Sequence, residues 1–80
     1  MLLENGFWLR CVYRDGDVLD FRAGRLVMGD NKMELLSQKG ETLVSSVPPR
    51  SWCIFDPTGK PIDGNTEPGD LVKLFIASPR

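Results

Sequence analysis

The chain has 80 residues, of which 41% are hydrophobic and 26% are charged, and its formal net charge is −1. This composition is typical of one small folded domain over residues 1–80 and excludes a disordered tail. Charges of both signs are interleaved without acidic or basic blocks, which argues against general electrostatic affinity for nucleic acid or anionic membranes.

The first predicted element is a β-hairpin. Residues 6–14 are rich in aromatic and β-compatible side chains, and Asp15-Gly16 is a strong signal for a two-residue turn. With that turn at the centre, Arg14 faces Asp17 and Arg10 faces Phe21 across the hairpin. Because side chains alternate along a strand, one face is the better candidate for the main core. Its apolar members are Phe7, Leu9, Cys11, Tyr13 and Val18.

The opposite face of this hairpin is the candidate functional surface. Its members are Trp8, Arg10, Val12, Arg14, Asp17, Leu19 and Phe21. Trp and Arg are enriched at binding hot spots, and aromatic side chains beside Arg also form stacking platforms for single-stranded nucleic acid. The alternative is that Trp8 and Phe21 cover a second small core, with Arg10 stacked on Phe21.

Further short strands follow. Residues 25–28 form a strand between a turn at Ala23-Gly24 and another at residues 29–31. Pro48-Pro49 then breaks the chain, because a proline pushes the residue before it to extended geometry. Residues 51–55 form the next strand.

The segment between these strands is ambiguous. Residues 33–37 and 42–47 fit a second hairpin. The alternative is one short helix near residues 32–39, with Asn31 as its N-cap and Gly40 at its far end. The strands are favoured, since a lone helix of about two turns is marginal without packing.

The stretch "FDPTGKPIDG", residues 55–64, contains Gly59-Lys60 and superficially suggests a phosphate-binding loop. Such a loop needs Ser or Thr after the lysine, and here Pro61 follows it. Asp, Pro and Gly at their turn positions instead predict a hairpin turn that leads into a short edge strand. The last apolar run, residues 71–78, predicts a final strand that is central or closes a barrel.

Together these segments predict a mainly β domain with about six to seven short antiparallel strands. We expect a small barrel or sandwich of SH3-like or OB-like architecture. Closure is favoured at this size because an open sheet leaves edges that are prone to aggregation.

Catalytic and metal-binding chemistry has little support. The chain contains no histidine, which removes the commonest general base and metal ligand. Asp15 and Asp17 flank a turn, where Asp bonds local backbone amides. Cys11 and Cys53 have no CxxC partner and fit free, half-buried thiols, or a disulfide if they lie on facing strands. We therefore expect no enzyme activity, no metal and no cofactor.

The leading functional hypothesis is a non-enzymatic interaction module. It binds a protein or peptide through Trp8, Arg10, Arg14 and Phe21, or through an open sheet edge. One alternative is a barrel for single-stranded nucleic acid, which the net charge disfavours. Another is a small-ligand-binding accessory protein that acts as a homodimer. No segment resembles a signal peptide or membrane span, so we expect a cytoplasmic location and no membrane partner.

Overall fold

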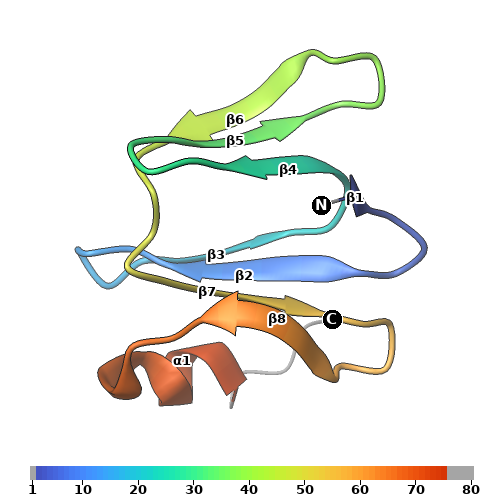
Figure 1. Cartoon of the computed structure of the whole chain (residues 1–80). Coiled ribbons are helices and arrows are strands. Elements are labelled where there is room, and N and C mark those ends of the chain that lie inside the picture. Colours follow the sequence, from blue (N-terminus) through green and yellow to red (C-terminus); the bar gives the residue numbers. More distant parts are fainter. Residues whose placement is uncertain (1, 76–80) are drawn as a thin grey trace.

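The computed structural model describes residues 2–75. They form eight strands in two four-stranded antiparallel sheets, followed by one short helix (Figure 1). Sheet A has the strand order β1-β4-β5-β6, and sheet B has the order β3-β2-β7-β8. The mainly β prediction is thus confirmed. Within the described part of the chain, the two sheets do not close into a barrel.

The strands of both sheets are short. Those of sheet A are β1 (Leu2–Leu3), β4 (Gly24–Met28), β5 (Met33–Leu36) and β6 (Thr42–Ser46). Those of sheet B are β2 (Trp8–Val12), β3 (Val18–Phe21), β7 (Ser51–Phe55) and β8 (Pro61–Asn65). A 3-10 turn, η1 (Pro68–Asp70), leads directly into the helix α1 (Leu71–Phe75).

Two expectations about helix and strand are decided by these elements. The segment that could be a helix near residues 32–39 contains β5, so the favoured strand prediction is confirmed. The predicted final strand is wrong over residues 71–75, which form α1, and its remainder, residues 76–78, lies outside the described residues. Pro68 explains the difference, because proline at the first helical position has its backbone angle preset for a helical turn.

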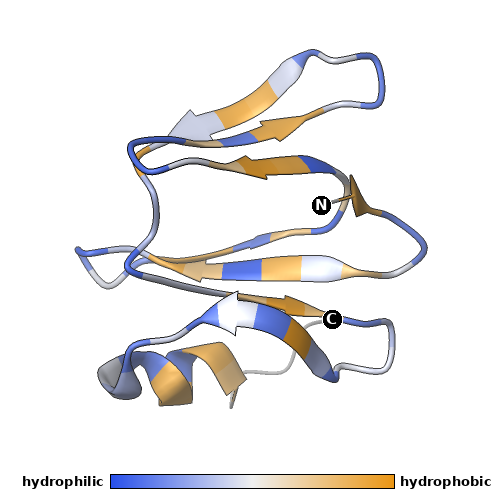
Figure 2. Cartoon of the chain, in the orientation of Figure 1, coloured by the Kyte–Doolittle hydropathy of each residue, from blue (hydrophilic) through white to orange (hydrophobic). Residues whose placement is uncertain are grey.

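The apolar side chains are divided between two clusters. The main core lies between the sheets and contains Leu3, Leu9, Cys11, Leu26, Met33, Leu35 and Ile54. The second cluster lies between sheet B and α1 and contains Trp8, Val12, Cys53, Phe55 and Leu74. Sheet B is therefore packed on both faces, whereas the connecting turns are mostly hydrophilic (Figure 2).

The turn in "FDPTGKPIDG" is built as predicted. The Asp56 carboxylate accepts hydrogen bonds from the backbone N–H groups of Thr58 and Lys60, both at 2.9 Å. Gly59 has a φ of 89°, a conformation that favours glycine. Pro61 then begins β8, which pairs only with β7 among the described strands. This stretch is therefore a hairpin turn with an edge strand after it.

Both cysteines are free, as predicted, but both are buried and not half-buried. Cys53 pairs with Arg10, the neighbour of Cys11 in β2, which places the two thiols on opposite faces of sheet B. Burial raises the pKa of the Cys11 thiol to about 12. Neither thiol is placed to react with the other.

Candidate functional site

The turn of the first hairpin contains three residues rather than two. The Tyr13 N–H donates to the Asp17 carbonyl at 2.9 Å, and the Gly16 N–H donates to the Tyr13 carbonyl at 2.9 Å. Gly16 adopts a φ of 90°, as the glycine of a three-residue hairpin loop does. The Asp15 carboxylate accepts the Asp17 N–H at 3.0 Å, so the prediction that Asp serves the turn here is confirmed.

This turn shifts the predicted register by one residue. Arg10 pairs with Asp20 and Leu9 with Phe21. A slip of one residue moves every side chain of the slipped strand to the opposite face. Phe21 therefore packs against the main core, while Trp8 belongs to the second cluster under α1. The expectation that Trp8, Arg10 and Phe21 share one face is wrong.

Trp8 is buried, with 4% of its surface exposed. Its ring stacks on Phe55 with the centroids 4.2 Å apart and the planes 12° from parallel. The guanidinium carbons of Arg10 and Arg22 lie 5.2 and 5.6 Å from the centroid of the Trp8 ring. These contacts match the alternative of a second small core, although Phe21 has no part in it.

Arg10 is also buried and is committed to other groups of the fold. Its Nε and Nη2 donate to the Asp20 carboxylate at 2.7 and 2.9 Å, and its Nη1 lies 3.4 and 3.5 Å from the carbonyls of Lys73 and Leu74. The hydrogen bond with Asp20 raises the pKa of the guanidinium above its ordinary value. One side chain thus joins β2, β3 and α1.

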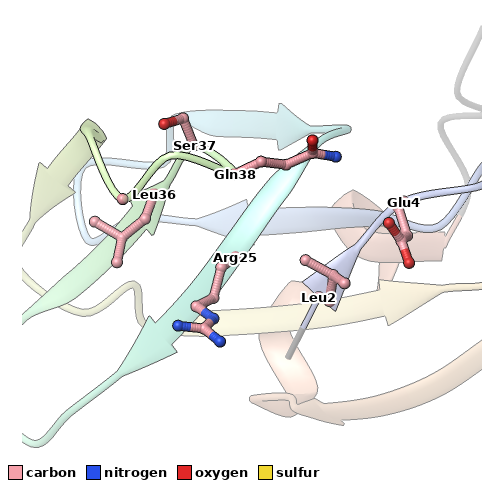
Figure 3. Close-up of a pocket in the computed structure, with 7 residues that line it drawn as sticks. Leu2, Glu4, Arg25, Leu36, Ser37 and Gln38 are labelled. Carbon is pink, nitrogen blue, oxygen red and sulfur yellow. The ribbon is translucent and has the colours of Figure 1, made fainter.

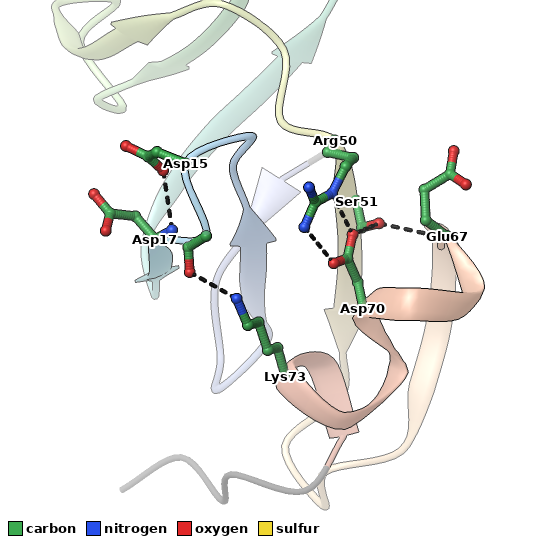
Figure 4. Close-up of polar contacts among 8 residues, drawn as sticks. Asp15, Asp17, Arg50, Ser51, Glu67, Asp70 and Lys73 are labelled. Carbon is green, nitrogen blue, oxygen red and sulfur yellow. Dashed lines mark hydrogen bonds and ion pairs between the residues drawn. The ribbon is translucent and has the colours of Figure 1, made fainter.

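A second ion pair holds α1 and η1 against sheet B (Figure 4). The Asp70 carboxylate accepts from Nε and Nη2 of Arg50 at 2.9 and 2.6 Å, and it also accepts the hydroxyl of Ser51. These donors lower the pKa of Asp70, the Arg50 bond most of all. Lys73 adds a bond from its Nζ to the Gly16 carbonyl at 3.1 Å. The helix therefore covers the face on which Trp8 and Arg10 lie.

The exposed parts of the first hairpin are its turn, in which Arg14 lies, and most of β3. We call the hollow beside Arg14 the hairpin groove; it has a volume of about 390 Å³. Its lining is Tyr13, Arg14, Asp15, Asp17, Leu19, Val44, Ser46, Val47 and Pro48. The β2–β3 turn and the connection from β6 to β7 lie at the same end of the molecule (Figure 1). Of the four predicted site residues, Arg14 alone lines this groove.

Two apolar side chains of the groove, those of Leu19 and Val44, belong to the inner faces of the two sheets. Leu19 pairs with Cys11, and Val44 pairs with Leu35, and both partners are main-core residues. Residues that pair across neighbouring strands point to the same face of the sheet. Leu19 is nevertheless 47% exposed. The space between the sheets therefore opens to the surface here, between the edge strands β3 and β6.

A smaller hollow of about 300 Å³ lies beside β1, β4 and the turn between β5 and β6 (Figure 3). Its lining is Leu2, Glu4, Arg25, Leu36, Ser37, Gln38 and Gly40. Polar and apolar side chains are mixed around it, and Arg25 is its only cation among the described residues. It has less apolar surface to bury than the hairpin groove does.

Sequence reasoning missed the apolar side of the hairpin groove. The sequence predicts the correct hairpin for Leu19 but the wrong face, because the turn has three residues and not the predicted two. The signal was present in Asp15-Gly16-Asp17, since an aspartate before a glycine also fits a three-residue loop. Nothing in the sequence marks Val47 as a candidate site residue except its position before Pro48-Pro49.

Residues 2–75 contain no group of three or more His, Cys, Asp or Glu side chains that could hold a metal ion. Over the same residues, no helix has the length and apolar character needed to cross a membrane. Comparison of the chain with protein-family models, with curated proteins and with solved structures finds no match.

Proposed function

We propose that this protein is a small non-enzymatic interaction module that binds a protein or peptide partner in the hairpin groove. The observation that carries the proposal is an apolar hollow at an open side of the fold, flanked by two sheet edges. Val47 at its rim is 68% exposed, and Leu19 within it is 47% exposed. Convergent apolar side chains with a few polar groups are typical of a binding site.

The proposed kind of function is the one predicted from the sequence, but the proposed binding surface is the hairpin groove and not the face that contains Trp8 and Arg10. Trp8 and Arg10 are occupied by packing and hydrogen bonds within the fold, so a partner would need to displace α1 to reach them. Arg14 stays in the proposed site, because it lines the groove. Because the two sheets do not close, the predicted closure into a barrel is not observed, whereas the likeness to SH3-like or OB-like architecture and self-association remain predictions.

The single-stranded nucleic-acid alternative has lost its main argument. It depended on Trp8 and Arg10 as an exposed stacking platform, and both side chains are buried. The hairpin groove contains two carboxylates, Asp15 and Asp17, beside one guanidinium. A polyanion would meet repulsion there, so a protein or peptide partner is the better supported of the two.

A library of random 12-residue peptides displayed on phage tests the proposal. We expect the immobilised protein to enrich binders whose affinity falls about tenfold or more with Val47→Lys, because the new charge enters the apolar groove. Val72→Lys is the matched control, since Val72 on α1 is 64% exposed and is not part of the groove lining. Failure to enrich any peptide, or equal losses with both variants, would refute a binding role for the groove.

A further inference from the structure

The edge of β3 offers backbone hydrogen-bonding groups. Among the described strands β3 pairs only with β2, so its other side is open. In an antiparallel pair, residues alternate between exchanging hydrogen bonds with the partner strand and pointing those groups away. The Tyr13–Asp17 bond closes the hairpin and fixes this alternation. The backbone N–H and C=O groups of Val18 and Asp20 therefore point toward the open edge.

The other edge beside the groove is less suited to pairing. The register between β5 and β6 shifts between Leu35 and Leu36, which places a bulge in that pair. Bulges increase local twist and are one way in which edge strands avoid pairing with another chain. The register of β2 with β3 is regular from Val12 to Leu9. An added strand would therefore pair with β3.

A strand added to β3 would lie beside the apolar lining. Side chains of an extended segment alternate between two faces, so every second one would point toward the space between the sheets. Leu19 of β3 and Val44 of β6 line that space. An apolar side chain of the partner fits there, and main-chain hydrogen bonds with β3 would supply the orientation.

The charged side chains that line the groove are mostly acidic, although the Lys73 ammonium bonds the Gly16 carbonyl between Asp15 and Asp17. Arg14, Val47 and Pro48 also line a second hollow of about 440 Å³, which extends to Asp30. Across the two hollows, the charged lining residues are three carboxylates, of Asp15, Asp17 and Asp30, and the one guanidinium of Arg14. Figure 4 shows the carboxylates of Asp15 and Asp17 directed to the same side of the turn. A positively charged side chain on the partner would complement this excess of negative charge.

We infer that the partner is an extended peptide segment that adds a strand to β3, places an apolar side chain between Leu19 and Val44, and carries a neighbouring Lys or Arg that the carboxylates lining the two hollows attract. This inference rests on the proposed function, because it names the binding mode of the same groove. Strand addition combines main-chain hydrogen bonds for affinity with side-chain pockets for specificity.

Peptides enriched in the phage selection, resynthesised with N-methylated backbone amides, test the strand addition. One set carries methyl groups at every second amide, and the second set carries them at the amides between. We expect one set to lose about tenfold or more in affinity and the other to bind nearly as the parent does, since only alternate amides face β3. If both sets bind like the parent, strand addition is wrong, whereas sensitivity to Val47→Lys would still support the groove.

The double variant Asp17→Asn with Asp30→Asn tests the charge. We expect enriched peptides to contain Lys or Arg beside an apolar residue, and to bind this variant about fivefold more weakly at low salt. Higher salt should weaken binding to the parent protein more than binding to the variant. Asp63→Asn on β8 is the control, because Asp63 lies outside both hollows. Enriched peptides without basic residues, or equal affinity for variant and parent, would overturn the basic-partner part of the inference.

Discussion

At the scale of single residues, Arg10 joins three elements of the fold: β2, on which it lies, β3 and α1. Its guanidinium is bidentate to Asp20 and also reaches the carbonyls of Lys73 and Leu74 in α1. A planar donor with five N–H groups suits such a position, which a lysine could fill only in part. Arg10, which the sequence suggests as a binding hot spot, therefore holds β2, β3 and α1 together through hydrogen bonds.

We predict that Arg10→Ala lowers the free energy of unfolding by about 3 kcal/mol, because it leaves the Asp20 carboxylate without its partner and removes packing beneath α1. Arg14→Ala should change that free energy by about 0.5 kcal/mol or less, since Arg14 is exposed in the turn. Urea titrations followed by tryptophan fluorescence measure both. Similar losses in the two variants would contradict the structural role given to Arg10.

At the scale of elements, the edge strand β8 shows that an exposed residue does not always tolerate substitution. All five of its residues are exposed. A Cβ added at Gly64 would nevertheless lie 2.7 Å from the carbonyl oxygen of Trp52 and 3.1 Å from the Cα of Cys53. Real Cβ atoms essentially never approach backbone so closely. The backbone of β8 therefore needs glycine at this position to approach β7.

We predict that Gly64→Ala destabilises the protein by roughly 1–3 kcal/mol, the usual range for forcing an extra methyl group into a packed place. Gly69→Ala is the control, because a Cβ there meets no atom within 4 Å. That variant should be neutral or gain up to about 1 kcal/mol from the lower entropy of the unfolded chain. Thermal unfolding of both variants distinguishes these outcomes, and a neutral Gly64→Ala would show that β8 can move away from β7.

The segment formed by η1 and α1 depends on Asp70 in a pH-dependent way. The pKa of Asp70 is lowered from its ordinary value of 3.8 in the folded protein, first by the hydrogen bond from Arg50 and then by that from Ser51. A carboxyl group with a lowered pKa contributes stability above its unfolded pKa, and this contribution is lost as the pH falls through the folded value. The pKa of Asp56 is lowered too, so its contribution has the same sign.

We predict that Asp70→Asn lowers the melting temperature at pH 7 and that the difference from the parent shrinks as the pH falls from about 5 to about 2. Asp63→Asn, in an exposed position of β8, is the control for the loss of one carboxylate. Circular dichroism melts at a series of pH values measure this. A difference that stays constant down to pH 2 would mean that the Asp70 charge does not contribute to holding η1 and α1.

At the scale of the whole molecule, local turn chemistry was the most predictable part of the fold. Strand 51–55 and the turn after Asp56 were located correctly, because Pro, Gly and Asp mark their ends through backbone geometry alone. The predicted strand over residues 71–75 is instead the helix α1. A short apolar run fits a buried strand or a buried helix equally well, and only its packing against sheet B decides between them.

The candidate site is less predictable from the sequence than the fold is, because it depends on the pairing register of β2 with β3. One residue in the turn length decides whether Leu19 or Val18 faces the main core. The groove also needs Val44 and Val47, which are distant in sequence from the first hairpin and carry no motif. Arg14 could be selected from the sequence because it lies in the turn itself, where the register does not move it.

The order of strands in sheet B has a consequence for how the chain folds. β4, β5 and β6 follow one another in sequence and pair as neighbours, whereas β2 pairs with β7 through contacts such as Val12 with Ser51. Closing that long loop costs entropy, and the cost is smaller once the intervening chain is already compact. The β4–β5–β6 meander has only local pairings and can form early. We therefore expect the joining of β2 to β7 to be a late step of folding, so that the face of sheet B on which α1 packs is completed only then.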